Sequence, residues 1–250
     1  MIKKIRGDMS SWSRWKIFKI AWFSLVTIFL IWNWTTFQSR GLPDNVLSNS
    51  KVVAVEETDD EIIFISLTLK KNLEVIFFQG GLVDPKAYAP LCRSLAENGY
   101  TCHIIKMAWR LAQYDYQKVP KIFDLKGGNY VIGGHSQGAK MAASLVFENP
   151  AVFKGLFLMG TSHPRDIDMS GMNIPTLKLY AELDGLASVS EVLENKSKLP
   201  GNAELVLIKG GNHSQFGYMG KLLMDNSATV SVTEQQELVV GHLLKFFSKI

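Results

Sequence analysis

The chain has 250 residues, of which 47% are hydrophobic and 20% are charged, a composition that suits one globular domain with a short extension. Its net charge of +4 is unevenly distributed, because residues 1–40 hold seven of the 27 lysines and arginines but one of the 23 acidic residues. The rest of the chain is therefore mildly acidic, which gives no electrostatic reason to expect nucleic-acid binding.

An apolar stretch from Ile17 to Trp34 lies inside the basic N-terminal region. Residues 20–32 are uncharged, and Trp22 and Trp32 lie near the ends of the stretch, as aromatic residues do at membrane interfaces. About 18 residues is close to the shortest helix that spans a bilayer. Positive charges before the stretch outnumber those just after it, so we expect the N-terminus in the cytoplasm and the rest of the chain outside.

We therefore predict three parts: a cytoplasmic basic tail and transmembrane signal anchor over residues 1–40, a linker over 41–50, and one folded domain over 51–250. This makes the chain a single-pass protein of the cell membrane. A cleaved signal peptide is disfavoured because residues 35–39 offer no convincing cleavage site. A soluble amphipathic helix is disfavoured because residues 20–31 are apolar nearly all round. Gly41 and Pro43 are typical of a linker.

The domain begins with two predicted strands, over residues 51–56 and 61–69, which a polar turn joins into an antiparallel edge hairpin. Residues 73–78 are apolar enough for a strand that is covered on both faces. Asp84 followed by Pro85 then predicts the start of a helix that runs to about Glu97.

Strands and helices alternate through the remainder of the chain. We predict further strands over residues 100–107, 130–135, 155–159, 176–180 and 204–208, and helices over 114–123, 139–146 and 233–249. This alternation indicates a doubly wound, mostly parallel sheet of the α/β class.

The two cysteines, Cys92 and Cys102, lie in a predicted helix and a predicted strand, and we expect both to be buried apolar residues, with a disulfide between them less favoured. The sequence has no zinc-type spacing of Cys and His, no P-loop and no G-x-G-x-x-G pattern. It therefore predicts neither a metal site nor a cofactor.

The sequence Gly134-His135-Ser136-Gln137-Gly138 follows an apolar strand and precedes a segment with helical spacing. This G-x-S-x-G pattern, in this context, predicts a nucleophile elbow with Ser136 in a strained turn. Glycines on both sides avoid collisions with the neighbouring strand and helix. The start of the helix directs N–H groups and a positive dipole end toward an oxyanion.

An acid and a histidine follow two later strands. Asp184 comes after the strand at 176–180, and His213 after the strand at 204–208. Reactive residues gather at the carboxyl ends of parallel strands, so we expect these residues to meet Ser136 there. In this hypothesis His213 takes the proton of Ser136, which attacks a carbonyl, and Asp184 orients His213. Glu182 is the main alternative acid, and Asp166 and Asp168 are weaker ones.

The oxyanion is expected to bind the N–H of Gln137 and one further N–H, from Gly81 or Leu82, because two glycines there let the backbone approach a substrate. The glycines could instead only relieve crowding at the turn. Of the other histidines, His135 is expected to pack beside the elbow, His103 to lie in a strand and His242 on the C-terminal helix. His163 is expected in a loop near the mouth of the site, where a plain loop role is favoured over contact with the substrate.

These stretches resemble the α/β-hydrolase superfamily and, more narrowly, a bacterial membrane-anchored branch of dienelactone-hydrolase-like proteins. The matching residues are 78–91, 133–139, 183–187 and 210–217, which span about residues 73–240. The sequence Gly-Gly-Asn-His-Ser-Gln-Phe-Gly at 210–217 is the most specific of them. Gln79 and Ala108 stand where this branch usually has proline, and both departures bear on the shape of the pocket.

The resemblance implies an α/β-hydrolase fold that cleaves a carboxylic ester, thioester or lactone through an acyl-enzyme, with a small-molecule or acyl substrate and no cofactor. About 16 residues separate the strands at 155–159 and 176–180, too few for a helical cap domain, so we expect an open site. The alternative is a membrane-tethered binding or scaffold protein that keeps the fold without turnover. The intact order of serine, aspartate and histidine favours the enzyme.

Overall fold

The computed structural model describes residues 13–250, so the basic residues Lys3, Lys4 and Arg6 of the predicted cytoplasmic tail lie outside the described residues. The chain divides after Thr36 into two compact units. The first contains helix α1 (Arg14–Thr36), whose 23 residues are long and apolar enough to cross a membrane. Its length of about 35 Å exceeds the hydrocarbon core of a bilayer. The predicted apolar helix is therefore present.

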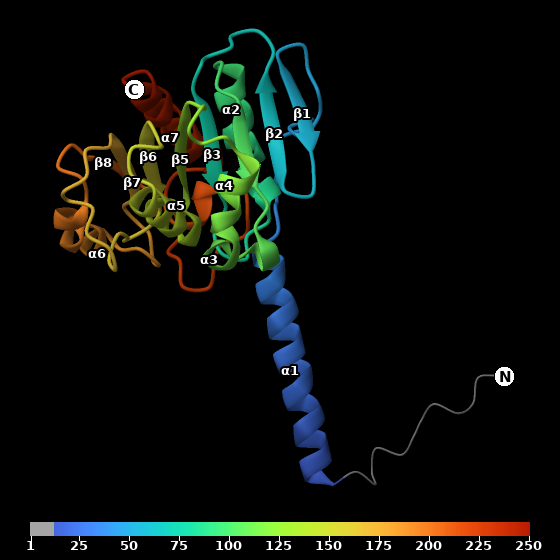
Figure 1. The fold of residues 1–250 in the computed structure, drawn as a ribbon. Coiled ribbons are helices and arrows are strands. Elements are labelled where there is room, and N and C mark those ends of the chain that lie inside the picture. The colour runs from blue at the N-terminus through green and yellow to red at the C-terminus, as the bar shows by residue number, and fades with distance from the viewer. Residues whose placement is uncertain (1–12) are drawn as a thin grey trace. The chain divides into compact units, whose positions relative to one another are not determined.

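The second unit, residues 37–250, is built on one eight-stranded sheet in the order β1-β2-β4-β3-β5-β6-β7-β8 (Figure 1). The strands are β1 (Val53–Glu57), β2 (Glu61–Ser66), β3 (Glu74–Phe78), β4 (Cys102–Ile105), β5 (Tyr130–His135), β6 (Gly155–Met159), β7 (Thr176–Ala181) and β8 (Glu204–Ile208). β2 pairs antiparallel with β1 and with β4, and all other pairs are parallel. The predicted edge hairpin and the mostly parallel sheet are confirmed.

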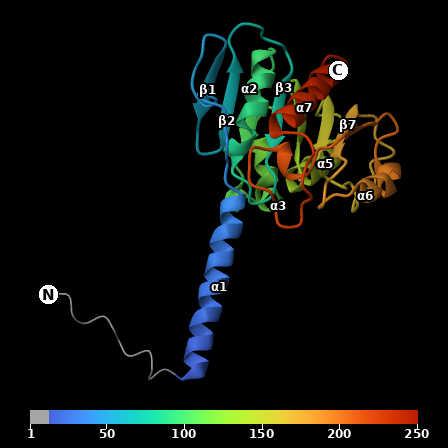
Figure 2. The same ribbon diagram turned by 180° about the vertical axis from the view of Figure 1, so that it is seen from behind.

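Helices cover both faces of this sheet. α2 (Ala89–Glu97) and α7 (Val232–Phe247) pack on one face, and α5 (Gln137–Glu148) packs on the other (Figure 2). Alternate residues of a strand serve the two layers: Phe77 of β3 packs with α2 and α7, and its neighbour Ile76 packs with α5. Central strands must therefore be apolar at nearly every position, which is why β5 and β6 read as continuous hydrophobic runs.

Two helical regions differ from the prediction. The helix expected over residues 114–123 is broken into α3 (Ala112–Asp115), a 3-10 turn at Tyr116–Lys118 and α4 (Val119–Ile122). Pro120 lies in the first turn of α4, because proline has no N–H to donate within an established helix. A short helix that we did not predict, α6 (Val189–Glu194), begins at a capping box formed by Ser188 and Glu191.

The expectation of two separate cysteine thiols is corrected by the structure. Cys92 of α2 and Cys102 of β4 are both buried, as expected, but they form a disulfide with their Cα atoms 5.4 Å apart. The two residues are ten positions apart in the chain, and their pairing depends on how α2 packs against β4, which the spacing alone does not reveal.

The segment that connects the two units, residues 37–50, is fixed to the second unit. Arg40 N–H donates to the carbonyl of Tyr218 at 2.8 Å. The guanidinium of Arg93 on α2 donates to three carbonyl groups of the segment, those of Asn45, Val46 and Ser48. These contacts give the connecting segment a defined path along the domain.

Candidate active site

Ser136 lies in the sharp turn between β5 and α5, with φ 54° and ψ −119°, a conformation that is strained for a residue other than glycine. Its N–H donates to the carbonyl of Met159 on β6 at 2.9 Å, so the turn is tied to the neighbouring strand. A Cβ atom at either Gly134 or Gly138 would lie 2.3 Å from the carbonyl oxygen of Phe78. Both positions therefore require glycine, and the turn exposes the serine as an elbow does.

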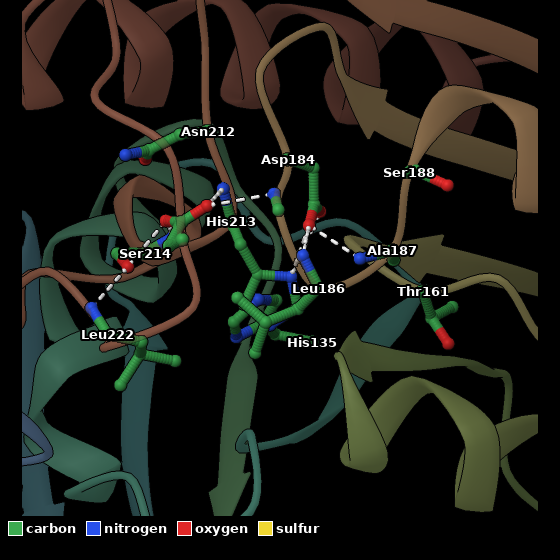
Figure 3. A network of polar contacts seen from close by, with 12 residues as sticks. His135, Thr161, Asp184, Leu186, Ala187, Ser188, Asn212, His213, Ser214 and Leu222 are labelled. Atoms are coloured by element: carbon green, nitrogen blue, oxygen red, sulfur yellow. Dashed lines mark hydrogen bonds and ion pairs between the residues drawn. The ribbon is translucent and has the colours of Figure 1, made fainter.

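Asp184 and His213, from the loops after β7 and β8, are hydrogen-bonded to each other. His213 Nδ1 lies 2.9 Å from Asp184 Oδ2 and 3.1 Å from Oδ1, with both side chains buried. Asp184 Oδ1 also accepts the N–H groups of Leu186 at 2.8 Å and Ala187 at 2.7 Å (Figure 3). The carboxylate is therefore fixed by backbone donors, and it in turn fixes the ring of His213 with Nε2 as the free nitrogen.

Ser136 and His213 share one open cavity of about 340 Å³ at the carboxyl edge of the parallel strands. Its lining comprises Gln113, Ser136, Gln137, Lys140, Gly160, Thr161, Ser162, His163, Arg165, Leu186, Ala187 and His213. Among the described residues the Ser136 hydroxyl makes no hydrogen bond with His213, although both residues line this cavity. A larger cavity, of about 510 Å³, lies against α2 and α7 and contains no member of the predicted triad.

The alternative acids are engaged elsewhere. Glu182 Oε2 accepts the N–H of Gly210 at 2.8 Å. Asp166 pairs with Lys140 at 2.5 Å, and Asp168 accepts the N–H of Ser170 at 2.9 Å. Of the four acids considered from the sequence, Asp184 is the one that contacts His213.

The three candidate oxyanion donors are not equally available. The N–H of Leu82 donates to the carbonyl of Arg110 at 2.8 Å, which removes Leu82 from the candidates. Gln137 opens α5, where its N–H has no acceptor within the helix. Gly81 lies beside it, since a Cβ at Gly81 would be 2.9 Å from Gln137 Oε1. Gly81 and Gln137 are the pair that remains.

A buried tyrosine and histidine support the Gly80–Gly81 turn. The hydroxyl of Tyr88 accepts the N–H of Gly80 at 3.0 Å and lies 2.8 Å from His135 Nδ1. Burial lowers the pKa of His135 well below its usual value, and the neighbouring His213 lowers it further. His135 is therefore a neutral packing residue beside the elbow, 4.5 Å from the His213 ring, in agreement with the sequence analysis.

Asp225, a residue that the sequence did not indicate, connects the two loops that carry Asp184 and His213. Its buried carboxylate accepts the N–H groups of Gly185 at 3.1 Å, His213 at 3.3 Å and Ser214 at 2.8 Å. It also accepts the Ser214 hydroxyl at 2.6 Å, and that hydroxyl accepts the N–H of Leu222 at 3.0 Å (Figure 3). An isolated aspartate in an irregular loop has no pattern from which this role can be read.

The C-terminal helix holds the histidine loop from the other side. Gln235 is fully buried, and its amide exchanges two hydrogen bonds of 2.9 Å with the backbone of Asn212. Gln236 Nε2 donates to the carbonyl of Gln215 at 2.7 Å. These glutamines occupy buried positions of α7 because their amides satisfy backbone groups next to His213.

The mouth of the cavity is formed by residues 160–175, which contain no helix, so the site has no cap domain. The loop is held from below by Lys178 of β7, whose ammonium group donates to the carbonyl of His163. Burial lowers the pKa of Lys178 to about 7. Burial also lowers the pKa of His163 to about 4, so this histidine is neutral near pH 7. Among residues 13–250 no cluster of His, Cys, Asp and Glu could hold a metal ion.

Comparison with solved structures shows which architecture this is. Est1E from Butyrivibrio proteoclasticus is 13% identical, with 79% of this chain and 100% of that chain covered and a TM-score of 0.53. The carboxylesterase CesB from Bacillus subtilis is 11% identical, with coverages of 81% and 93% and a TM-score of 0.56. The ferulic acid esterase from Streptomyces cinnamoneus is 16% identical, with coverages of 74% and 68% and a TM-score of 0.61. At these identities the likeness concerns the fold.

Sequence comparison identifies the family. A search of curated proteins found no significant match. A family model described as the alpha/beta hydrolase family matches residues 74–237, well over half of the chain and including every predicted catalytic residue. The broad resemblance is confirmed, and the narrower one to dienelactone-hydrolase-like proteins stays a prediction. This chain belongs to the alpha/beta hydrolase family.

Proposed function

We propose that this protein is a membrane-anchored serine hydrolase that cleaves a carboxylic ester, thioester or lactone through an acyl-enzyme on Ser136. The observation that carries the proposal is the arrangement of Asp184, His213 and Ser136. His213 is oriented by Asp184 at 2.9 Å, and its ring lines the same cavity as a serine in a strained elbow. A scaffold protein without turnover would have no use for a buried carboxylate aimed at a histidine beside this serine.

The proposed reaction uses each group at a stated atom. Ser136 Oγ attacks the carbonyl carbon while its proton passes to His213 Nε2, and Asp184 stabilises the imidazolium that forms. The N–H groups of Gly81 and Gln137 bind the oxyanion, and loss of one such donor is expected to lower turnover by about 10²–10³-fold. His213 then gives its proton to the leaving group. In the second half, water attacks the acyl-enzyme with His213 as the base.

We propose that α1 anchors the protein in the membrane and that the basic residues before it keep the N-terminus in the cytoplasm, with the catalytic unit outside. The disulfide between Cys92 and Cys102 supports this assignment, because disulfides persist outside the reducing cytoplasm.

The test is labelling of the full chain with a fluorophosphonate probe, together with hydrolysis of a p-nitrophenyl ester. We expect Ser136→Ala to abolish both, because the nucleophile is removed. We expect Asp184→Asn to lower kcat by about 10⁴-fold, because the amide no longer holds the required His213 tautomer.

Glu182→Gln is the matched control, since a glutamine oxygen still accepts the N–H of Gly210 and activity should stay near that of the parent. Failure of the parent protein to label, or full labelling of Ser136→Ala, would contradict the proposal. The first of these results would support the non-catalytic scaffold.

A further inference from the structure

The polypeptide enters the catalytic unit at the edge of the sheet where the cavity lies. The carbonyl of Phe37 accepts the N–H of Asp84, three residues after Gly81, at 2.8 Å. Ser39 Oγ donates to the Asp84 carboxylate at 3.1 Å, and the Ser39 backbone forms a β-bridge with Met219, in the loop that follows His213. The first residues of this unit are thus fixed between the oxyanion turn and the histidine loop.

No free linker separates this edge from the apolar helix. α1 ends at Thr36, and Phe37, the next residue, is already bound to the catalytic unit. The chain therefore passes from the last residue of α1 to the edge of the sheet that carries the oxyanion turn without a free residue between them.

Large apolar side chains are exposed around the cavity at the same edge. We call them the apolar rim: Leu82, Trp109, Tyr114, Leu186, Leu223 and Met224. On one side, Leu82 is bonded through its N–H to Arg110, and Gln113, next to Tyr114, lines the cavity. On the other side, Leu186 lines the cavity, and the backbone of Met224 packs against Gly185. Both views show α3 and the loop before α7 at one end of the sheet (Figures 1 and 2).

Trp109 is highly exposed and lies in a segment of unfavourable backbone conformation. Trp109 and Arg110 have φ values of 55° and 57°, and Leu82, hydrogen-bonded to Arg110, has φ 64°. Side chains other than glycine rarely adopt this region. The Trp109 side chain is 86% exposed, so its ring adds nothing to the stability of the domain in water. Large apolar side chains that the fold leaves exposed together beside a cavity are typical of a surface that contacts another apolar phase.

We propose that the apolar rim inserts into the surface of the bilayer that α1 spans, and that Ser136 cleaves acyl esters of amphiphiles that reside in that bilayer. This inference rests on the anchoring and the hydrolysis proposed above. Tryptophan and tyrosine are the side chains that prefer the membrane interface. The acyl chain of such a substrate passes over the rim, and no cap domain blocks its path. The ester bond breaks as His213 protonates the leaving alcohol, and water later releases the fatty acid.

The first experiment measures the position of Trp109 without using activity. In the full chain, the five tryptophans at positions 12, 15, 22, 32 and 34 are replaced with phenylalanine, so that Trp109 is the one of six that remains. The protein is reconstituted into phosphatidylcholine vesicles with brominated or ordinary acyl chains. We expect blue-shifted emission that brominated lipid quenches, because bromine quenches tryptophan only on contact.

The matched control moves the fluorophore to the opposite edge of the sheet. In the same background, Trp109→Phe is combined with Leu69→Trp, at an exposed position in the loop that precedes β3. We expect its emission to stay that of water-exposed tryptophan and to be unaffected by bromine. Equal quenching at both positions, or none at position 109, would overturn the proposal. Absence of quenching at position 109 would indicate that the apolar rim binds a partner protein instead of the bilayer.

The second experiment compares two substrates with the full chain in vesicles: a soluble short-chain p-nitrophenyl ester and a long-chain diacylglycerol within the bilayer. Trp109→Asn combined with Met224→Ser removes the two most exposed side chains of the apolar rim, and asparagine tolerates a positive φ. We expect the ratio of bilayer to soluble activity to fall by about tenfold, which corresponds to about 1.4 kcal/mol of lost apolar burial. Leu69→Ser should leave the ratio unchanged.

An unchanged ratio in the rim variant would contradict the inference. If the parent protein hydrolyses neither substrate and does not label with fluorophosphonate, the proposed function fails. Quenching of Trp109 would still decide whether the rim meets the bilayer. If the full chain does not remain with the vesicles, the anchoring fails first and the rim proposal with it.

Discussion

Two buried aspartates, Asp184 and Asp225, act on the same histidine in different ways. Asp184 contacts the imidazole of His213 and takes two further backbone N–H groups. Asp225 contacts the backbone of His213 and the backbone of Gly185, so it joins the loop of the acid to the loop of the base. A carboxylate removed from water is stable only when such donors surround it. Asp225 therefore positions these two loops, and it is not among the residues that line the cavity with Ser136.

We predict that Asp225→Asn lowers kcat by about 10–100-fold, the range found for outer-shell partners of catalytic groups, with little change in KM. The reason is that the amide NH₂ group meets backbone N–H donors, and one of the two loops must shift. The measurement is the rate at which a fluorophosphonate labels Ser136, followed across pH, together with kcat and KM for a soluble ester.

Asp168→Asn, in an exposed loop, is the control and should behave like the parent. A rise in KM with kcat unchanged would mean that Asp225 acts on substrate binding instead. An unchanged labelling rate would mean that the loops hold their positions without it.

The sequence could place the three residues of the proposed triad at one edge of the sheet, because topology decides where the ends of parallel strands lie. The carboxyl ends of the parallel strands β5, β7 and β8 lie at one edge of the sheet, and Ser136, Asp184 and His213 each follow one of these ends. Chain order could not reveal the role of Asp225. It also could not show that the N–H of Leu82 already donates a hydrogen bond. Both depend on hydrogen bonds between loops, such as that from Leu82 to Arg110, and irregular loops have no periodicity to read.

At the scale of elements, one histidine joins three strands of the sheet. His103 of β4 lies 2.8 Å from Glu61 of β2 through Nδ1 and 3.2 Å from Glu74 of β3 through Nε2. Burial alone lowers the pKa of His103, but the two carboxylates raise it by more, so the net shift is upward. The protonated ring is thus stabilised by the fold.

The sign of this shift predicts how stability depends on pH. Because the folded pKa of His103 is raised, its contribution is fully present below the unfolded value of about 6.5 and is lost as pH rises through the folded pKa. We expect His103→Gln to lower Tm by about 2–4 °C more at pH 6 than at pH 9, which is the shift for about 1 kcal/mol in a domain of this size. Thermal unfolding by circular dichroism measures it. An equal loss of Tm at the two pH values would contradict the ion-pair explanation.

A helix or strand could be predicted from the sequence where one pattern, a continuous apolar run or a single apolar face, determined it. The buried strands were evident from continuous apolar runs, and the C-terminal helix from its apolar face. The prediction of one continuous helix over residues 114–123 was wrong because Pro120 lies in the first turn of a separate helix, α4. α6 escaped notice because it has six residues and buries one of them, Val192, which gives no periodic pattern, although its capping box was visible. The disulfide could not be predicted because it depends on how α2 packs against β4.

At the scale of the whole molecule, the chain combines an apolar helix with a mildly acidic catalytic unit. The composition of residues 41–50 is typical of a linker. Yet Val46 is buried, and the carbonyls on both sides of it are acceptors for Arg93, 48 residues from Asn45. The composition of a segment indicates only its local conformational preference. It cannot show contacts with residues that are distant in the sequence, such as Arg93. The catalytic unit therefore begins at Phe37.

This boundary gives a prediction about two truncated chains. Residues 37–250 should be released into the soluble fraction, fold, and hydrolyse a soluble ester at the rate of the parent, because the triad and its supports lie within them. Residues 51–250 should also contain the triad but be less stable, because Arg93 loses its carbonyl acceptors and Val46 is removed from the core. Full burial of a valine contributes about 1.5–3 kcal/mol, or a Tm lower by about 3–12 °C in a domain of this size.

Thermal unfolding and esterase assays of both truncated chains, beside the full chain in detergent, measure this difference. The full chain should stay with membranes through carbonate washing, since a spanning helix is held by apolar burial, and the 37–250 chain should not. Equal Tm values for the two truncated chains would mean that residues 37–50 contribute nothing to the domain. The connection between α1 and the domain would then not be fixed, and it would no longer support the proposal that the apolar rim contacts the bilayer.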